Sequence, residues 1–372
     1  MTPRAPSHVE QIEPYVPGKP IEELERELGL RNSIKLASNE NPAGPSPRVI
    51  AAVRSAIPRL NRYPDGSGYY LRERIAAAHG VGMQQIVLGN GSTELVEVLA
   101  RTFLGNDGWA VMADQSFIMY RIATMAVNGR ARIVPLDGMT HDLNAMARAT
   151  TADVRLVYIA NPNNPTGTYV SDAALESFLR AVPEEVVVVL DEAYADYVDA
   201  DDYPNGARHV IAGRNVAVLR TFSKIHGLAG LRVGYAVTTE AIAASMEKIR
   251  SPFNTGSLGQ AAALAALDDS DHLIASRDLN RVERAFVESE LRRRGWSYTP
   301  TVANFHLIDL GRPALPVYEH LLRQGIIVRP MSTYNFPSCL RVTIGTREEN
   351  LRFLEALEGV RDRRGGEPKK TA

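Results

Sequence analysis

The sequence EVVVVLDEAY, residues 185–194, places four consecutive valines directly before an acidic and aromatic group. Such a run of β-branched residues predicts a strand buried on both faces, as in a parallel sheet covered by helices on each side. Short apolar runs at 154–160, 216–219 and 233–237 repeat the pattern, and helix-forming segments separate them. We therefore expect an α/β fold in which a large, mostly parallel sheet is flanked by helices.

On both sides of the segment that forms this sheet, the sequence predicts a different kind of structure. Prolines near the N-terminus predict an extended arm, and a short helix is expected at 21–30. After residue 296 the pattern becomes that of a smaller α+β domain. The predicted parts are an N-terminal arm with its short helix at 1–35, a large cofactor-binding domain at 36–255, a small C-terminal domain at 256–362 and a disordered tail at 363–372.

The composition argues against several classes of protein. The chain has 372 residues and a formal net charge of −1, whereas a nucleic-acid-binding domain normally carries a strongly basic face. No uninterrupted apolar segment reaches the ~18 residues of a membrane helix, and the proline-broken N-terminus is unlike a signal peptide. Cys339 is the single cysteine, which fits a reducing compartment. We expect a cytoplasmic protein that binds neither nucleic acid nor membrane, and we assign no metal ligand.

Three consecutive strand ends carry side chains that can do chemistry. The segment 161–167 (NPNNPTG) follows the strand at 154–160, Asp191 to Tyr194 follows the valines, and Thr221 to Lys224 follows the strand at 216–219. Each segment alone has a common structural explanation: 161–167 as a turn, Asp191 as a helix cap and Lys224 as a surface lysine. Together they are unusual, because parallel strands present their carboxyl ends at one edge, where α/β sheets bind ligands.

This set of groups matches the requirements of pyridoxal phosphate (PLP). The cofactor needs an amine that forms an imine with its aldehyde, and a buried carboxylate that keeps its pyridine nitrogen protonated. Its ring oxygen needs an amide and a phenol, and its phosphate needs hydroxyls, a cation and a helix start. The sequence offers these groups as Lys224, Asp191, Asn164, Tyr194, Ser223, Arg232 and the segment Gly91-Ser92-Thr93.

The motifs resemble those of fold-type I PLP-dependent aminotransferases of class I and II. The matching motifs, in the order of that family, are Asn-Pro-Thr-Gly at 164–167, Asp-Glu-Ala-Tyr at 191–194, Ser-Lys at 223–224 and Gly-Leu-Arg-Val-Gly at 230–234. The resemblance covers most of the chain, from about residue 10 to residue 360. Within the family the chain is most similar to the histidinol-phosphate aminotransferases, through the segments 15–20, 36–42, 62–65, 325–331 and 340–346.

The resemblance implies a role for each cofactor residue. Lys224 would carry the cofactor and move the proton at the substrate Cα, with Asp191 on the pyridine nitrogen and Tyr194 on the ring oxygen. The other implied contacts are Asn164 at the ring oxygen, Tyr120 stacked on the ring, and Ser92, Thr93, Ser223 and Arg232 at the phosphate. Tyr63 resembles a tyrosine that reaches the phosphate of the partner subunit, so the family implies a homodimer.

The substrate side is implied in the same way. Arg341 resembles the family's clamp for the substrate α-carboxylate, Arg329 the residue that binds the phosphate of histidinol phosphate, and Tyr15 a cover from the arm. The favoured reaction transfers an amino group from histidinol phosphate to a 2-oxo acid, 2-oxoglutarate, in histidine biosynthesis.

Three alternatives stay open. Transamination of an aromatic amino acid such as phenylalanine and decarboxylation of a phosphorylated amino acid would use the same cofactor. A PLP-dependent regulator would need a DNA-binding extension, for which the sequence has no room before residue 10 or after residue 361.

Five places depart from the family pattern. Gln115 stands where proline is usual, and Thr93 where an acidic or amide residue is common. Ile225-His226 follows the lysine in place of Ala-Tyr, Asn254-Thr255-Gly256 replaces Asn-Val-Asn, and Asn335-Phe336 replaces Gly-Leu. Several of these departures lie on the expected substrate side of the site. They do not affect the assignment of the cofactor, but they leave the identity of the amino donor undecided.

Overall fold

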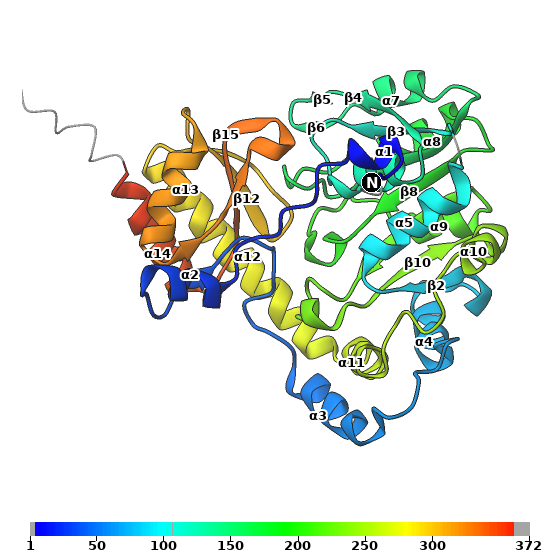
Figure 1. The fold of residues 1–372 in the computed structure, drawn as a ribbon, viewed down its shortest axis with the longest axis horizontal. Helices are drawn as coiled ribbons and strands as arrows, with labels where there is room; N and C mark the ends of the chain where they lie inside the picture. Colours follow the sequence, from blue (N-terminus) through cyan, green and yellow to red (C-terminus); the bar gives the residue numbers. More distant parts are fainter. Residues whose placement is uncertain (1–3, 106, 361–372) are drawn as a thin grey trace, which may run out of the picture.

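The computed structural model describes residues 4–105 and 107–360, which form a larger and a smaller α/β body (Figure 1). The long helix α12 (Ser270–Arg293) leads from the larger body into the smaller one. The N-terminal arm, predicted to be extended, contains one helical turn, α1 (Ser7–Glu10), which packs against the larger body. Helix α2 (Ile21–Leu28) follows and lies on the smaller body. No helix in the described ranges is both long and apolar enough to cross a membrane.

The larger body is built on a seven-stranded sheet. Its strands, in spatial order, are β2 (Ile86–Gly89), β10 (Gly234–Thr238), β9 (Val216–Thr221), β8 (Val187–Asp191), β7 (Val154–Ala160), β3 (Trp109–Ala113) and β4 (Arg130–Val134). Strand β10 is antiparallel to both of its neighbours, and the remaining pairs are parallel. The prediction of a mostly parallel sheet is therefore confirmed.

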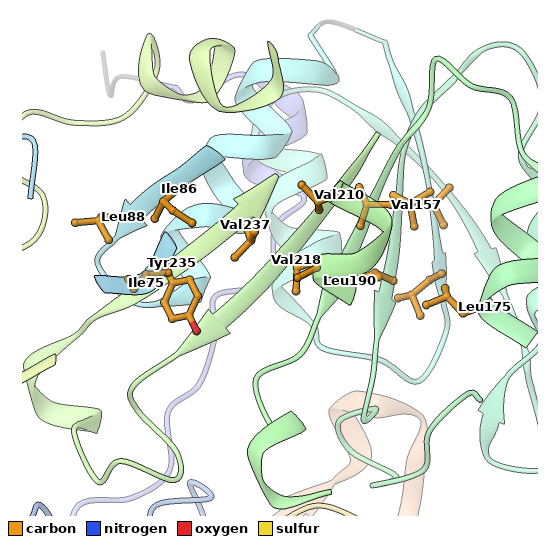
Figure 2. Close-up of a cluster of buried hydrophobic side chains, with 14 of the residues drawn as sticks. Ile75, Ile86, Leu88, Val157, Leu175, Leu190, Val210, Val218, Tyr235 and Val237 are labelled. Carbon is orange, nitrogen blue, oxygen red and sulfur yellow. The ribbon is translucent and has the colours of Figure 1, made fainter. Parts of the chain in front are cut away.

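Helices cover both faces of this sheet, because its strands carry apolar side chains on both sides. In β8, Val188 and Leu190 pack into one buried cluster, whereas Val187 and Val189 pack into the cluster on the opposite face. Figure 2 shows part of the first cluster around Val218 and Leu190. The helices on its side are α3 (Pro47–Ala56), α4 (Tyr69–His79), α7 (Leu143–Ala149), α8 (Asp172–Ala181), α9 (Gly206–Ile211) and α11 (Ser257–Leu267). The opposite face is covered by α5 (Ser92–Phe103), α6 (Met119–Ala126) and α10 (Glu240–Glu247).

The smaller body holds a four-stranded antiparallel sheet. Its strand order is β11 (Ser297–Thr299), β12 (Phe305–Asp309), β15 (Phe336–Thr343) and β14 (Arg329–Met331). Helices α12, α13 (Ala314–Arg323) and α14 (Arg347–Glu358) contribute to its core. Two short two-stranded pairings complete the fold, β1 (Ile34–Lys35) with β13 (Ile326–Ile327) and β5 (Leu136–Asp137) with β6 (Thr140–His141).

Packing divides the chain differently from the predicted boundaries at 35 and 255. Helix α11 packs on α3 and α4, and Ala262, Ala263 and Ala266 lie in the core of the large sheet. At the other end, Ile34 and Leu36 lie in the core of the smaller body because β1 pairs with β13. The predicted tail at 363–372 lies outside the described residues.

Candidate active site

A cavity of about 250 Å³ opens at the carboxyl ends of the parallel strands. The register aligns these ends, since Ala160 pairs with Asp191 across β7 and β8, and Asp191 pairs with Leu219 across β8 and β9. The cavity brings together almost every residue expected from the sequence: Tyr15, Ser92, Thr93, Tyr120, Asn164, Asp191, Tyr194, Ser223, Lys224, Arg232, Arg329 and Arg341. In the described ranges, no group of three or more His, Cys, Asp or Glu side chains could hold a metal ion.

Lys224 lies just beyond β9 with its ammonium directed into this cavity. Its Nζ donates a hydrogen bond of 3.1 Å to the carbonyl of Ser38 and lies 5.5 Å from the centre of the Tyr194 ring. Burial lowers the pKa of Lys224 to about 8, and the positive charge of Arg341 acts in the same direction. A larger share of this lysine is therefore a free amine at neutral pH than is usual for lysine.

Asp191, the last residue of β8, is a buried carboxylate with two donors. The Tyr120 hydroxyl donates to its Oδ2 at 2.8 Å, and the backbone N–H of Ala193 donates to its Oδ1 at 3.1 Å. Burial raises the pKa of Asp191, while both hydrogen bonds and the nearby Lys224 oppose that increase. The site can thus hold a negative charge next to a positively charged ligand atom.

Tyr120 is placed differently from the prediction that it stacks on a ligand ring. It lies in α6, only 1% exposed, with its ring stacked on Tyr158 at a centroid distance of 4.7 Å. Phe117 precedes α6, lines the cavity and meets Tyr120 edge-on at 5.6 Å. The aromatic wall of the cavity at this point is therefore Phe117, and Tyr120 acts on Asp191.

Two side chains contact the residues predicted for the cofactor ring oxygen. Asn39 donates from Nδ2 to the Tyr194 hydroxyl at 2.9 Å. Because this hydroxyl accepts from Asn39, its own proton stays available for another acceptor. Asn164 accepts a short hydrogen bond from the Arg341 guanidinium.

The start of α5 and the Arg232 side chain form a cradle at one end of the cavity. Gly91 precedes α5 with a φ of 78°, and no side chain caps the helix, so its first N–H groups remain available. A Cβ at Gly91 would collide with the Arg232 guanidinium. Arg232 donates to Ser223 Oγ at 3.1 Å. A helix start, a guanidinium and hydroxyls are the groups that bind a phosphate.

Arg329 and Arg341 stand directly opposite each other on β14 and β15. Both line the cavity, and like charges at opposing positions destabilise a sheet unless an anion lies near them. Arg341 donates from Nη2 to the Ala37 carbonyl at 2.8 Å, and its buried Nε has no hydrogen-bond partner within residues 4–105 and 107–360. Tyr15 of the arm lies against Arg329, with the guanidinium 5.4 Å from the ring centre.

Tyr63 is the one predicted site residue that lies outside the cavity. Its side chain is 82% exposed and stacks on Phe253 at a centroid distance of 4.8 Å. Ile57, Leu60 and Tyr70 are exposed on the same segment of the chain, with exposed fractions of 48%, 54% and 70%. Such an apolar surface is typical of a protein interface.

Several residues that line the cavity were not predicted from the sequence, chiefly Ser38, Asn39, Phe117 and Tyr334. The first two lie in the segment 36–42, whose resemblance to the family was the only signal that could have found them. Of the departures, Gln115 and Asn335 both bond to Asp114, and the Ile225 carbonyl accepts from Asn41. Asn254 bonds to the Leu88 carbonyl and to Glu94, away from the cavity lining.

Most of the chain matches known proteins. Residues 31–357 match the model of the aminotransferase class I and II family. The chain belongs to the class I and II aminotransferases. This aminotransferase is 48% identical to the histidinol-phosphate aminotransferase of Moorella thermoacetica, over 96% of this chain and 93% of that one. It is 49% identical to histidinol-phosphate aminotransferase 2 of Pseudomonas fluorescens, over 95% and 96% of the two chains.

A solved structure shares the fold of this aminotransferase. The histidinol-phosphate aminotransferase of Sinorhizobium meliloti, crystallised with pyridoxal-5′-phosphate, superposes with a TM-score of 0.89 over 97% of this chain and 99% of that one, at 28% identity. The expected fold class is therefore confirmed.

Proposed function

We propose that this aminotransferase uses PLP to transfer the amino group of histidinol phosphate to 2-oxoglutarate. One observation carries the choice of substrate: Arg329 and Arg341 face each other across β14 and β15 at the cavity that holds Lys224. Such a pair suits a donor that carries a phosphate and an acceptor that carries two carboxylates. The relatives at 48% and 49% identity, named for histidinol phosphate, support the same choice.

The residues at the cavity fit the cofactor. The open start of α5, Gly91 without a Cβ, Ser92, Thr93, Ser223 and Arg232 would hold its phosphate. Asp191 would pair with its ring nitrogen, and Tyr194 and Asn164 would donate to its ring oxygen. Phe117 offers an aromatic face in the lining. When bound, PLP supplies an aldehyde that combines with amines and a ring that withdraws electrons from the bonds at the substrate Cα.

Lys224 does the proton chemistry. Its lowered pKa of about 8 lets the free amine accept a proton near neutral pH and return it. Asp191 would stabilise the protonated ring nitrogen of the bound cofactor. The hydrogen bond from Tyr120 orients that carboxylate and favours its ionised form. Because the Tyr194 hydroxyl accepts a hydrogen bond from Asn39, it can donate its own proton to a ligand in the cavity. Tyr15, lying on Arg329, reduces water access to the substrate anions.

The catalytic unit is proposed to be a homodimer. The exposed Tyr63–Phe253 pair supports it, and so do the exposed apolar side chains of Ile57, Leu60 and Tyr70 on the same segment as Tyr63, because exposed apolar surface is typical of protein interfaces. In such a dimer, Tyr63 would reach the phosphate cradle of the partner subunit.

A substrate panel tests the proposal. Oxo-acid or ketone formation would be measured with histidinol phosphate, phenylalanine and threonine phosphate as donors, and carbon dioxide release would be measured in parallel. We expect histidinol phosphate to give the highest kcat/KM and no release of carbon dioxide from threonine phosphate. Arg329→Gln should lower kcat/KM for histidinol phosphate more than for phenylalanine, while Lys224→Ala should abolish turnover. A preference for phenylalanine, or equal losses with both donors in Arg329→Gln, would refute the proposed donor.

A further inference from the structure

Asp114 and Asn335 connect the two bodies beside the active-site cavity. Asp114 directly follows β3 in the larger body, and Asn335 lies between the turn Ser332–Tyr334 and β15 in the smaller body. The Asn335 Nδ2 donates to the Asp114 carboxylate at 3.1 and 3.2 Å. Their neighbours Phe117 and Tyr334 both line the cavity, so this contact joins two of its walls.

The backbone at Asn335 explains why an asparagine can stand where the family commonly has glycine. Its φ is 59°, in the left-handed region that glycine adopts freely and asparagine tolerates better than most residues. Glycine would satisfy the turn and offer no side chain. Asparagine satisfies the same turn and adds the amide that reaches Asp114.

The loop on the larger body, residues 114–118, is itself firmly held. Asn163 accepts from the Ser116 hydroxyl at 3.0 Å and donates to the Gln115 carbonyl at 2.9 Å. Gln115, which also departs from the family pattern, donates from Nε2 to Asp114 at 3.0 Å. The two residues that depart from the family pattern, Gln115 and Asn335, therefore both donate hydrogen bonds to Asp114, on the loop that also carries Phe117.

The smaller body contributes the hairpin that carries the two arginines. This arginine hairpin, residues 329–343, runs from β14 through the turn to β15, and Asn335 lies near its tip. Beside the tip, Met331 and Tyr334 belong to a small buried cluster against which Ile118 of the loop packs. The hydrogen bond and this apolar contact together fix the tip against the loop.

We propose that Asp114 and Asn335 are positioning residues that set the distance between the arginine hairpin and the Phe117 loop, and thereby the fit of the substrate anions. This inference rests on the proposed function, in which Arg329 and Arg341 bind those anions. Neither residue touches the reacting atoms. Loss of the contact changes how tightly the anions are bound and leaves the proton chemistry at Lys224 in place.

The test begins with Asn335→Gly, which keeps the left-handed turn and removes only the amide. We expect KM for 2-oxoglutarate to rise about threefold to tenfold, the effect of losing one exposed hydrogen bond to a charge, with kcat within about twofold of the wild type. The dissociation constant of glutarate, an unreactive dicarboxylate, should rise by the same factor in calorimetry. Asn128→Gly, at an exposed position with a φ of 57°, is the matched control and should change neither value.

A donor–acceptor exchange completes the test. Asn335→Asp places two carboxylates together and should raise KM and the glutarate constant beyond the Asn335→Gly values. Adding Asp114→Asn restores the hydrogen bond, now with the amide at position 114 and the carboxylate at position 335. In the double variant, KM and the dissociation constant of glutarate should therefore return toward the wild-type values. Unchanged constants in Asn335→Gly, a fall in kcat alone, or a double variant no better than Asn335→Asp would overturn the inference.

The two proposals fail separately. The kinetic constants of the variants are measured with the amino donor that the wild type uses fastest, whichever it is. Glutarate binding is measured without any amino donor. A donor other than histidinol phosphate would therefore refute the proposed reaction and leave the positioning test standing.

Discussion

The hydroxyl of Tyr120 donates a 2.8 Å hydrogen bond to the carboxylate of Asp191. The two residues come from different elements, α6 and the end of β8, and both are almost completely buried. Burial raises the pKa of Asp191, and the bond from Tyr120 is the largest influence in the opposite direction. Tyr120 thus helps to keep Asp191 ionised at the position where a cofactor ring nitrogen needs a negative charge.

Replacing Tyr120 by phenylalanine tests this relationship. The loss of one hydrogen bond to a buried charge should lower kcat roughly tenfold and weaken PLP binding, because a more readily protonated Asp191 holds the ring nitrogen less well. Steady-state kinetics and PLP titration of the apoenzyme measure both effects. Tyr158→Phe, which removes the same atom from the stacked neighbouring ring, should stay within about twofold of the wild type. Equal behaviour of the two variants would contradict the assignment.

The pH dependence of cofactor attachment should reflect the unusual amine of Lys224. Burial lowers its pKa to about 8, so the ammonium predominates below that pH and the reactive amine above it. The rate at which the apoenzyme takes up PLP, followed by absorbance, should rise with pH through a midpoint of about 8. Because the charge of Arg341 contributes to the lowering, Arg341→Gln should move the midpoint upward. A midpoint near the ordinary lysine value would exclude the effect of burial, and an unmoved midpoint in Arg341→Gln would exclude the effect of the arginine charge.

Gly91 should be required for the phosphate cradle. Alanine at this position needs a strained backbone and drives the Arg232 guanidinium away from the start of α5, so we expect PLP affinity to fall at least tenfold. Gly80→Ala provides the comparison, since Gly80 also has a positive φ, 67°, and open space around it. That variant should lose about 1 kcal/mol of stability and keep its PLP affinity. Fluorescence titration and thermal unfolding distinguish the two effects.

Mixed dimers can show whether Tyr63 serves the partner subunit. Lys224→Ala and Tyr63→Phe chains with different tags would be co-expressed, and the heterodimer isolated. If Tyr63 acts across the interface, one site of the heterodimer has both residues intact, and activity should reach about half that of the wild type. If Tyr63 acts within its own subunit, neither site is complete, and activity stays at the level of the Tyr63→Phe site alone.

The cofactor side of the site could be predicted because its signals are local. Asp191 ends an apolar strand, Asn164 and Lys224 follow theirs within a few residues, and parallel pairing then brings the strand ends to one edge. Tyr120 lines the cavity, but its hydroxyl bonds to Asp191 and its ring stacks on Tyr158, contacts that the sequence did not indicate. Because α6 starts at Met119, Tyr120 points into the core and Phe117 stays on the preceding loop. Helix propensity does not predict the start of a helix to within a few residues.

Other features depend on contacts between distant segments. Asn39 reaches the site because its backbone N–H bonds to Thr343, 304 residues away, and no local pattern indicates that pairing. The same holds for β1, which joins the smaller body by pairing with β13. Helix α11 follows the boundary predicted at residue 255, and its alanine-rich surface packs against α3 and α4 of the larger body, a contact that no local pattern indicates.

The long-range bonds of Ala37 and Asn39 also order events during synthesis on the ribosome. Both residues emerge early, but their partners Arg341 and Thr343 are translated 304 residues later. The nascent chain can therefore complete the seven-stranded sheet, with Asp191 and Lys224 already at its edge, long before the anion-binding half of the cavity exists. A newly made subunit would therefore form its cofactor pocket first and its anion-binding arginines last, when β15 bonds to residues 37 and 39.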